Sequence, residues 1–66
     1  MKIHSTAIDE AFYSHKAQKL YIHLKDGRTA VYDSVSKEIW EEFKSADSKG
    51  NFYNVSIRGH YPWRYL

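Results

Sequence analysis

The stretch KLYIHLKDGRTAVYD, residues 19–33, decides which fold the rest of the chain completes. Three apolar residues alternate with mixed ones in its first half: Leu20, Ile22 and Leu24. A period of two is typical of a strand with one buried face. Asp26-Gly27 comes next, a pair typical of hairpin turns because glycine adopts positive φ without steric cost. Residues 28–33 are then the returning strand, so the stretch predicts an antiparallel hairpin.

Two registers remain open for this hairpin. A two-residue turn places Val31 opposite Ile22. A longer turn with a bulge places Ala30 opposite Ile22 instead, and Tyr32 opposite Leu20. One residue of slip exchanges the two faces of a strand, so the choice decides which side chains face the core.

Residues 36–46 are predicted to form the main helix, because apolar residues recur there at helical spacing. Ser36 as N-cap places Val35 and Trp40 in the positions of a hydrophobic staple. Glu38 falls in the first turn, where the helix dipole favours a negative charge. The other charged residues of this segment are expected to form a solvated face.

The expected fold class is α+β: a three-stranded antiparallel β-meander packed against the main helix and a second short helix at about residues 49–57. The third strand is expected at residues 7–13. Ser48 is a candidate N-cap for the short helix, Gly59 a C′ residue, and Pro62 prevents the helix from resuming. Six residues are expected to be mostly buried: Leu20, Ile22, Leu24, Ile39, Phe43 and Ile57.

The composition indicates one domain, residues 1–66. A domain of this size buries only about 60% of the surface of its unfolded chain, and there is no cysteine to add a disulfide. The 17% aromatic content compensates, since each large ring buries roughly 150–250 Å². No apolar run approaches the roughly 18–20 residues of a membrane span, and the first ten residues do not resemble a signal peptide. We therefore expect a cytoplasmic monomer with no membrane contact.

The last nineteen residues, 48–66, differ from the rest of the chain. All eight acidic residues precede Ser48, together with seven of the ten basic ones. The tail carries the other three cations and five aromatic rings. A basic segment with interleaved aromatic residues is typical of surfaces that bind RNA.

This tail also carries a family resemblance. SKGNFYNVSIRGHYPW, residues 48–63, resembles the signature of the KTSC domain, a module named for its occurrence at the C-terminus of some lysyl-tRNA synthetases. The resemblance covers about residues 5–65. Further family-like positions lie upstream: Ile8, Tyr13, Leu20, Ile22, Leu24, Gly27, Tyr32 and Val35.

The resemblance implies a three-stranded meander with one or two helices, and a function that is largely unassigned. Many members carry aromatic residues at both positions that correspond to Ala30 and Tyr32, which implies that these positions face the core. For that reason we predict the bulged turn over residues 25–27. Family members often have proline where this chain has Ser36, which leaves the helix start open by one residue.

The residues do not favour catalysis. The four histidines show no metal-ligand spacing, and no serine lies in a nucleophile elbow. Gly50 and Gly59 do not form a phosphate loop. We therefore expect neither an enzyme, nor a metal site, nor a cofactor.

The tail is left with two interpretations. In the first interpretation the tail binds RNA, and the binding is weak and sensitive to salt because the tail has so few cations. The residues expected to contact the RNA are Lys49, Asn51, Arg58, His60, Tyr61, Trp63 and Arg64. Arg58 is expected at the surface near Lys49, on the side of the short helix that faces away from Tyr53. Six other tail residues are expected to have structural roles: Ser48, Gly50, Phe52, Tyr53, Asn54 and Ile57. Among these, Gly50 is expected to allow close packing of the helix on a strand, and Asn54 to bond to buried backbone groups at the helix end. In the second interpretation the aromatic residues anchor another protein, and the returning strand is a free sheet edge.

Overall fold

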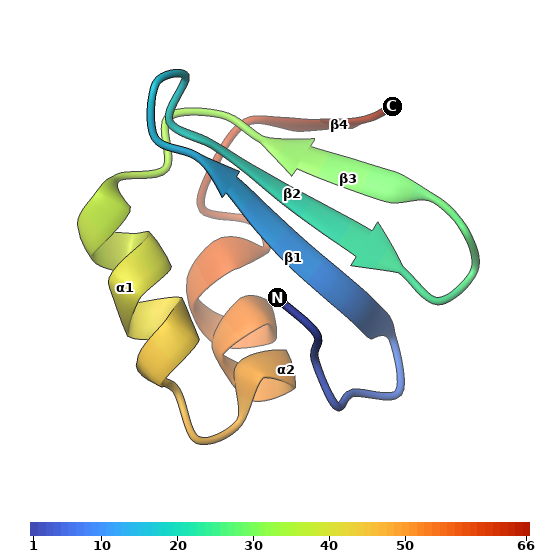
Figure 1. Cartoon of the computed structure of the whole chain (residues 1–66). Helices are drawn as coiled ribbons and strands as arrows, with labels where there is room; N and C mark the ends of the chain where they lie inside the picture. The colour runs from blue at the N-terminus through green and yellow to red at the C-terminus, as the bar shows by residue number, and fades with distance from the viewer.

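The computed structural model of the protein describes residues 1–66 and shows two layers, a four-stranded antiparallel sheet and the helices on one of its faces (Figure 1). The strands, in sheet order, are β1 (Ile8–Ser14), β2 (Lys19–Leu24), β3 (Thr29–Tyr32) and β4 (Trp63–Tyr65). The helices are α1 (Lys37–Ser45) and α2 (Lys49–Phe52), and α2 continues as the π-helix η1 (Tyr53–Ile57). The expected α+β class with an antiparallel sheet and two helical regions is confirmed.

The bulged register of the hairpin is confirmed. Ile22 pairs with Ala30, and Leu20 pairs with Tyr32. The Leu24 N–H donates to the Arg28 carbonyl at 2.8 Å, which closes a three-residue loop. Gly27 has a φ of +94°, a conformation that side chains disfavour, so glycine at this position fixes the turn and with it the register.

The expectation of three strands is wrong, because the end of the tail forms β4. This strand pairs with β3, and two bonds frame the pairing: Asp33 N–H to the Pro62 carbonyl and Leu66 N–H to the Thr29 carbonyl, both 2.9 Å. Pro62 precedes the strand, where its missing N–H costs no ladder bond. The returning strand β3 is therefore an inner strand, and the expectation that it is a free edge is also wrong.

The start of the main helix agrees with the prediction. The Ser36 hydroxyl accepts a hydrogen bond from the Ile39 N–H at 3.3 Å, so Ser36 is the N-cap. Ala46 follows the helix as its C-cap. Val35 and Trp40 are both buried, which is consistent with the staple.

The core lies between the helices and the inner face of the sheet. Four of the six residues expected in it are completely buried: Leu20, Ile22, Phe43 and Ile57. Leu24 and Ile39 are partly buried and pack at the margin of the core, which agrees with the expectation that they are mostly buried. Leu24 ends β2 beside an open cleft, whereas Ile39 lies on the flank of α1, which buries Trp40 and Phe43 instead.

The second helix occupies the expected residues, but its second half is a π-helix. The Ser48 hydroxyl accepts from the Asn51 N–H at 3.2 Å, which makes Ser48 the N-cap. The Arg58 N–H donates to the Tyr53 carbonyl five residues earlier, at 2.9 Å. Gly59 follows with a φ of +78°, a conformation typical of a C′ glycine. None of the helices has the length and apolar character that crossing a membrane requires.

Phe43 provides a test of the core, since its ring is completely buried and stacks on Phe52 at 5.6 Å between ring centroids. We predict that Phe43→Ala lowers the free energy of unfolding by about 3–5 kcal/mol, enough to unfold much of a domain of this size. Urea denaturation followed by circular dichroism measures the loss. Val55→Ala, at an exposed position, is the control and is expected to change the value by less than about 0.5 kcal/mol. Equal midpoints for the two variants would contradict this placement of the core.

Candidate functional site

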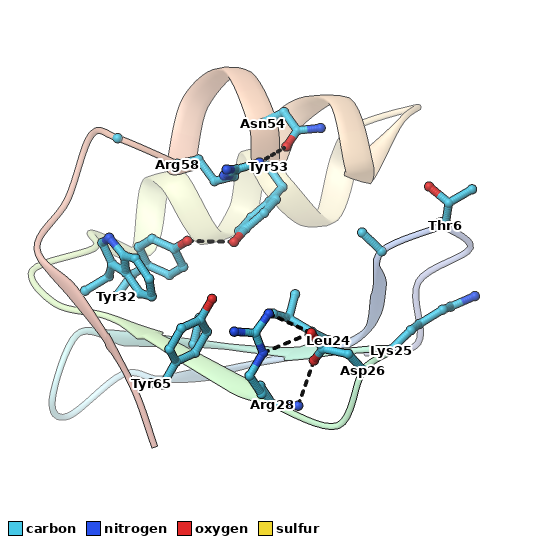
Figure 2. Close-up of a pocket in the computed structure, with 14 residues that line it drawn as sticks. Thr6, Leu24, Lys25, Asp26, Arg28, Tyr32, Tyr53, Asn54, Arg58 and Tyr65 are labelled. Atoms are coloured by element: carbon cyan, nitrogen blue, oxygen red, sulfur yellow. Dashed lines mark hydrogen bonds and ion pairs between the residues drawn. The ribbon is translucent and has the colours of Figure 1, made fainter.

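A cleft of about 560 Å³ lies between η1 and the β3–β4 side of the sheet (Figure 2). Pockets for single small ligands have volumes of roughly 300–1,000 Å³. Four aromatic side chains from both layers line it: Tyr32, Tyr53, Trp63 and Tyr65. The charged side chains around it come from the hairpin turn and from the end of η1. The cleft is therefore both aromatic and basic.

Two tyrosine hydroxyls form the inner wall. Tyr32 and Tyr53 are buried, and their hydroxyl oxygens lie 2.6 Å apart in a hydrogen bond (Figure 2). Burial, and then the bond with Tyr32, raise the pKa of Tyr53 well above its usual value of 10, although the nearby Arg58 opposes the shift. The Tyr53 side chain therefore remains a neutral hydroxyl in neutral solution.

The outer wall is built by β4. Its pairing with β3 places Trp63 beside Tyr32, at 6.1 Å between ring centroids and 28° between ring planes. Tyr65, two positions further along β4, lies on the same face of the sheet. Its ring packs edge-on against that of Trp63, at 4.8 Å between ring centroids. The two residues are 49% and 43% exposed, so much of their ring surface remains open to a ligand.

Arg28 lies at the base of the cleft, held in place by Asp26. Its Nε and Nη2 donate to one carboxylate oxygen of Asp26 at 2.9 and 2.7 Å. These hydrogen bonds hold the pKa of Asp26 below its usual range, so Asp26 stays ionised. The guanidinium carbon of Arg28 is 4.5 Å from the centre of the Tyr65 ring, a cation–π distance.

Arg58 lies on the helical side of the same cleft. Its Nη1 donates to Asn54 Oδ1 at 3.4 Å, and no carboxylate lies within ion-pair distance of its guanidinium. Spacing in an ideal helix places Arg58 on the side away from Tyr53, yet both residues line the cleft. That expectation is wrong because a π-helix returns to the same side after five residues rather than four.

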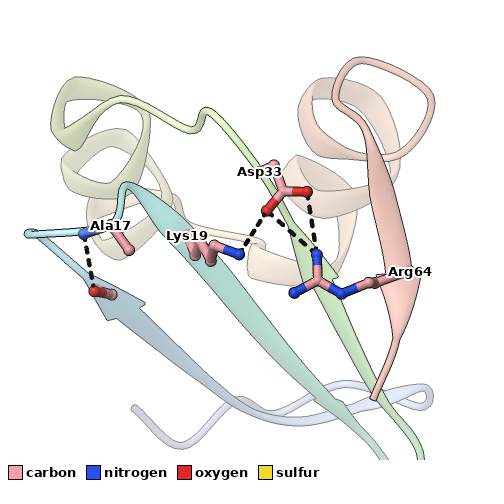
Figure 3. A network of polar contacts seen from close by, with 5 residues as sticks. Ala17, Lys19, Asp33 and Arg64 are labelled. Atoms are coloured by element: carbon pink, nitrogen blue, oxygen red, sulfur yellow. Dashed lines mark hydrogen bonds and ion pairs between the residues drawn. The ribbon is translucent and has the colours of Figure 1, made fainter.

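Arg64 lies on the other face of the sheet. Alternation along β4 turns it away from Trp63 and Tyr65, and it pairs with Val31 on the face that carries no helix. There its Nη1 donates to Asp33 at 3.2 Å, and Lys19 contacts the same carboxylate at 3.2 Å (Figure 3). The expectation that Arg64 and Arg58 lie on one binding surface is therefore wrong, because Arg64 forms an ion pair on the opposite face of the sheet.

The remaining candidates for binding lie outside the cleft. Lys49 donates to the Ala46 carbonyl at 3.1 Å and borders a separate polar hollow near the N-terminal segment, so it does not lie beside Arg58 as expected. The His60 Nε2–H donates to the Val55 carbonyl at 2.9 Å, and Tyr61 packs against the core. Asn51 is exposed on α2.

The residues expected to have structural roles divide into two groups. Phe52 and Ile57 pack against or within the core, as predicted. Gly50 permits close packing, since a Cβ at this position would lie 3.2 Å from Ser5 Oγ. The segment that packs against it is therefore the N-terminal segment and not a strand. Tyr53 and Asn54 line the cleft, and Asn54 is exposed and bonds to Arg58 instead of satisfying buried backbone groups.

Reasoning from the sequence missed the contribution of the hairpin to this site. Lys25, Asp26, Arg28 and Tyr32 all line the cleft, and none was singled out as a binding residue. No local pattern identifies them, since they meet η1 only after the tail has folded back over the sheet. No group of three or more histidine or acidic side chains is placed to hold a metal ion.

The fold and the cleft together define a small α+β domain with an aromatic, basic cleft between its helical layer and its sheet. The family model of the KTSC domain matches residues 4–61, and the chain belongs to this family. A KTSC domain protein of Yersinia pestis, known from a crystal structure, superposes with a TM-score of 0.93 at 27% sequence identity. The match covers 100% of this chain and 93% of that protein. No curated protein matches the sequence.

The tyrosine pair gives the site a testable energetic signature. We predict that Tyr32→Phe and Tyr53→Phe each lower the free energy of unfolding by about 1–3 kcal/mol, because each leaves one buried hydroxyl without its partner. The double variant is expected to lose less than the two single losses combined. Tyr65→Phe, at a half-exposed ring, is the control with little effect. Strictly additive losses in urea denaturation would show that the hydroxyls do not interact.

Proposed function

We propose that the chain is a non-catalytic binding domain that takes single-stranded RNA into the cleft between η1 and β4. One observation carries the proposal. The guanidinium of Arg58, which has no carboxylate partner, and the half-exposed rings of Trp63 and Tyr65 line the same cleft. This combination offers both contacts that a single strand needs, one for phosphate and one for a base.

The chemistry of these groups favours an unpaired strand. Stacking of a base on an aromatic ring is worth about 1–3 kcal/mol and needs a base that is free of its own stack. The guanidinium fork of arginine suits phosphate oxygens. A duplex keeps its bases stacked inside and offers the rings of this cleft only backbone and edges.

Binding of this kind is weak and depends on salt, because few cations contact the strand. By analogy, the occurrence of the KTSC domain at the C-terminus of some lysyl-tRNA synthetases agrees with an RNA ligand. A monomer acting in the cytoplasm, without a metal or cofactor, is part of the same proposal.

A second candidate function is the binding of another protein. It is favoured by β4, which is the edge strand of the sheet and carries two half-exposed rings followed by Leu66, 79% exposed. Exposed edge strands accept an added strand, and tryptophan and tyrosine are enriched at the centres of interfaces. Affinity for such a partner would depend little on salt, unlike affinity for RNA.

Arg58→Ala tests the RNA proposal. We predict that the variant melts close to the parent, because the side chain is exposed and makes one long hydrogen bond. Its affinity for a short single-stranded RNA should fall, and the slope of log affinity against log salt should decrease by about one. Fluorescence anisotropy of labelled RNA at several salt concentrations measures both quantities.

The matched control is Arg64→Ala, which removes the same charge from the opposite face of the sheet. It is expected to keep the affinity and the slope of the parent within a small change. Loss of binding in Arg64→Ala with retention in Arg58→Ala would place the RNA on the wrong face for this proposal. Absence of RNA binding by the parent protein at low salt would contradict the proposal itself.

A further inference from the structure

The cleft is closed at one end by the segment that precedes β1. Ser5 packs against Gly50 of α2, and Ser5 Oγ lies 3.2 Å from the point where a Cβ on residue 50 would stand. Two residues later, the Ala7 carbonyl accepts a hydrogen bond from the Lys25 N–H at 2.9 Å. Thr6 and Ala7 line the cleft between these two contacts, so the segment bridges the helical layer and the hairpin (Figure 2).

The opposite end is closed by the connection from η1 to β4. Gly59 lines the cleft there, and the Pro62 carbonyl fixes the connection to β3 through the Asp33 N–H at 2.9 Å. A strand of RNA that runs through the cleft would have to pass one of these two barriers. The cleft therefore has the form of a bowl that admits a protruding group, and its volume of about 560 Å³ suits one small ligand.

The charge of the bowl matches a phosphate monoester better than a diester. Its lining holds three cations, Lys25, Arg28 and Arg58, against the single carboxylate of Asp26, which leaves a net charge of +2. A terminal phosphate carries about −1.5 to −2 charges at pH 7, whereas each phosphodiester within a strand carries one. The Lys25 side chain extends away from the two guanidinium groups, and these two groups lie on opposite walls (Figure 2).

Neutral donors add to this arrangement. Tyr32 and Tyr53 together carry two hydroxyl protons, and their mutual hydrogen bond uses one. The Tyr65 hydroxyl points across the bowl toward η1 (Figure 2). Phosphate oxygens accept several hydrogen bonds at once, and contacts of this kind to a charged group are the strong ones.

We propose that the bowl binds the phosphorylated end of a single-stranded RNA, with the terminal phosphate between Arg28 and Arg58 and the terminal base against Trp63. This inference rests on the proposed function and specifies which part of the RNA is bound. The shared ligand chemistry is a phosphate monoester, whether it stands at the 5′ or the 3′ end of the strand.

The test compares four RNA oligonucleotides of one sequence by isothermal titration calorimetry with the full chain. One carries a 5′-phosphate, one a 3′-phosphate, one has no terminal phosphate, and one is circular. At least one phosphorylated oligonucleotide is expected to bind about tenfold more tightly than the unphosphorylated and circular ones, which is the value of one added charge-assisted contact. Whichever of the 5′- and 3′-phosphorylated oligonucleotides binds more tightly identifies the end of the RNA that the cleft recognises.

Arg58→Ala should remove this preference for a phosphorylated end, and Arg64→Ala should keep it. Equal binding of the circular and the phosphorylated oligonucleotides would overturn end recognition while leaving single-stranded binding intact. No binding of any of the four would overturn the inference and the proposed function together. A preference that survives Arg58→Ala would also overturn the inference, since the phosphate would then lie elsewhere.

Discussion

The register of β2 against β3 is the constraint on which the rest of the structure depends. Gly27 at positive φ allows the three-residue loop, and the loop pairs Ile22 with Ala30 and Leu20 with Tyr32. A slip of one residue would turn Tyr32 away from the helices and bring Val31 toward them. The hydroxyl bond to Tyr53 would then be lost, and with it the inner wall of the cleft. A turn at the surface thus determines what the cleft contains.

The register of β2 against β3 also decides which face of the sheet each side chain of β4 occupies. Because β4 pairs with β3, Trp63 and Tyr65 follow Tyr32 and Ala30 onto the inner face, and Arg64 follows Val31 onto the outer one. The tail therefore divides its side chains between two surfaces. Its aromatic rings contribute to the cleft, while one of its three cations contributes to an ion pair that is exposed to solvent and worth little to stability.

The parts of the fold that the sequence predicts are those with local causes. The hairpin follows from alternation around Asp26-Gly27, and the start of α1 follows from the Ser36 cap; both need only neighbouring residues. β4 could not be predicted in the same way, because three residues after a proline show no period, and their pairing with β3 is a contact across half of the chain. The cleft is non-local for the same reason: Arg28 and Arg58 line the same cleft only once both layers are packed. The π-helix adds one residue to a turn, and that small change reversed the expected direction of Arg58.

The two tryptophans allow a direct test that the cleft is where RNA binds. Trp63 borders the cleft, whereas Trp40 is 8% exposed and packs on the core beside Phe43. The measurement is a ¹H–¹⁵N NMR titration of the chain with single-stranded RNA, in which the two indole N–H signals and the Arg58 Nε–H are followed. The account predicts that the Trp63 and Arg58 signals shift together while the Trp40 signal stays in place. Shifts confined to the Arg64 side of the sheet, or to the hollow beside Lys49, would contradict it.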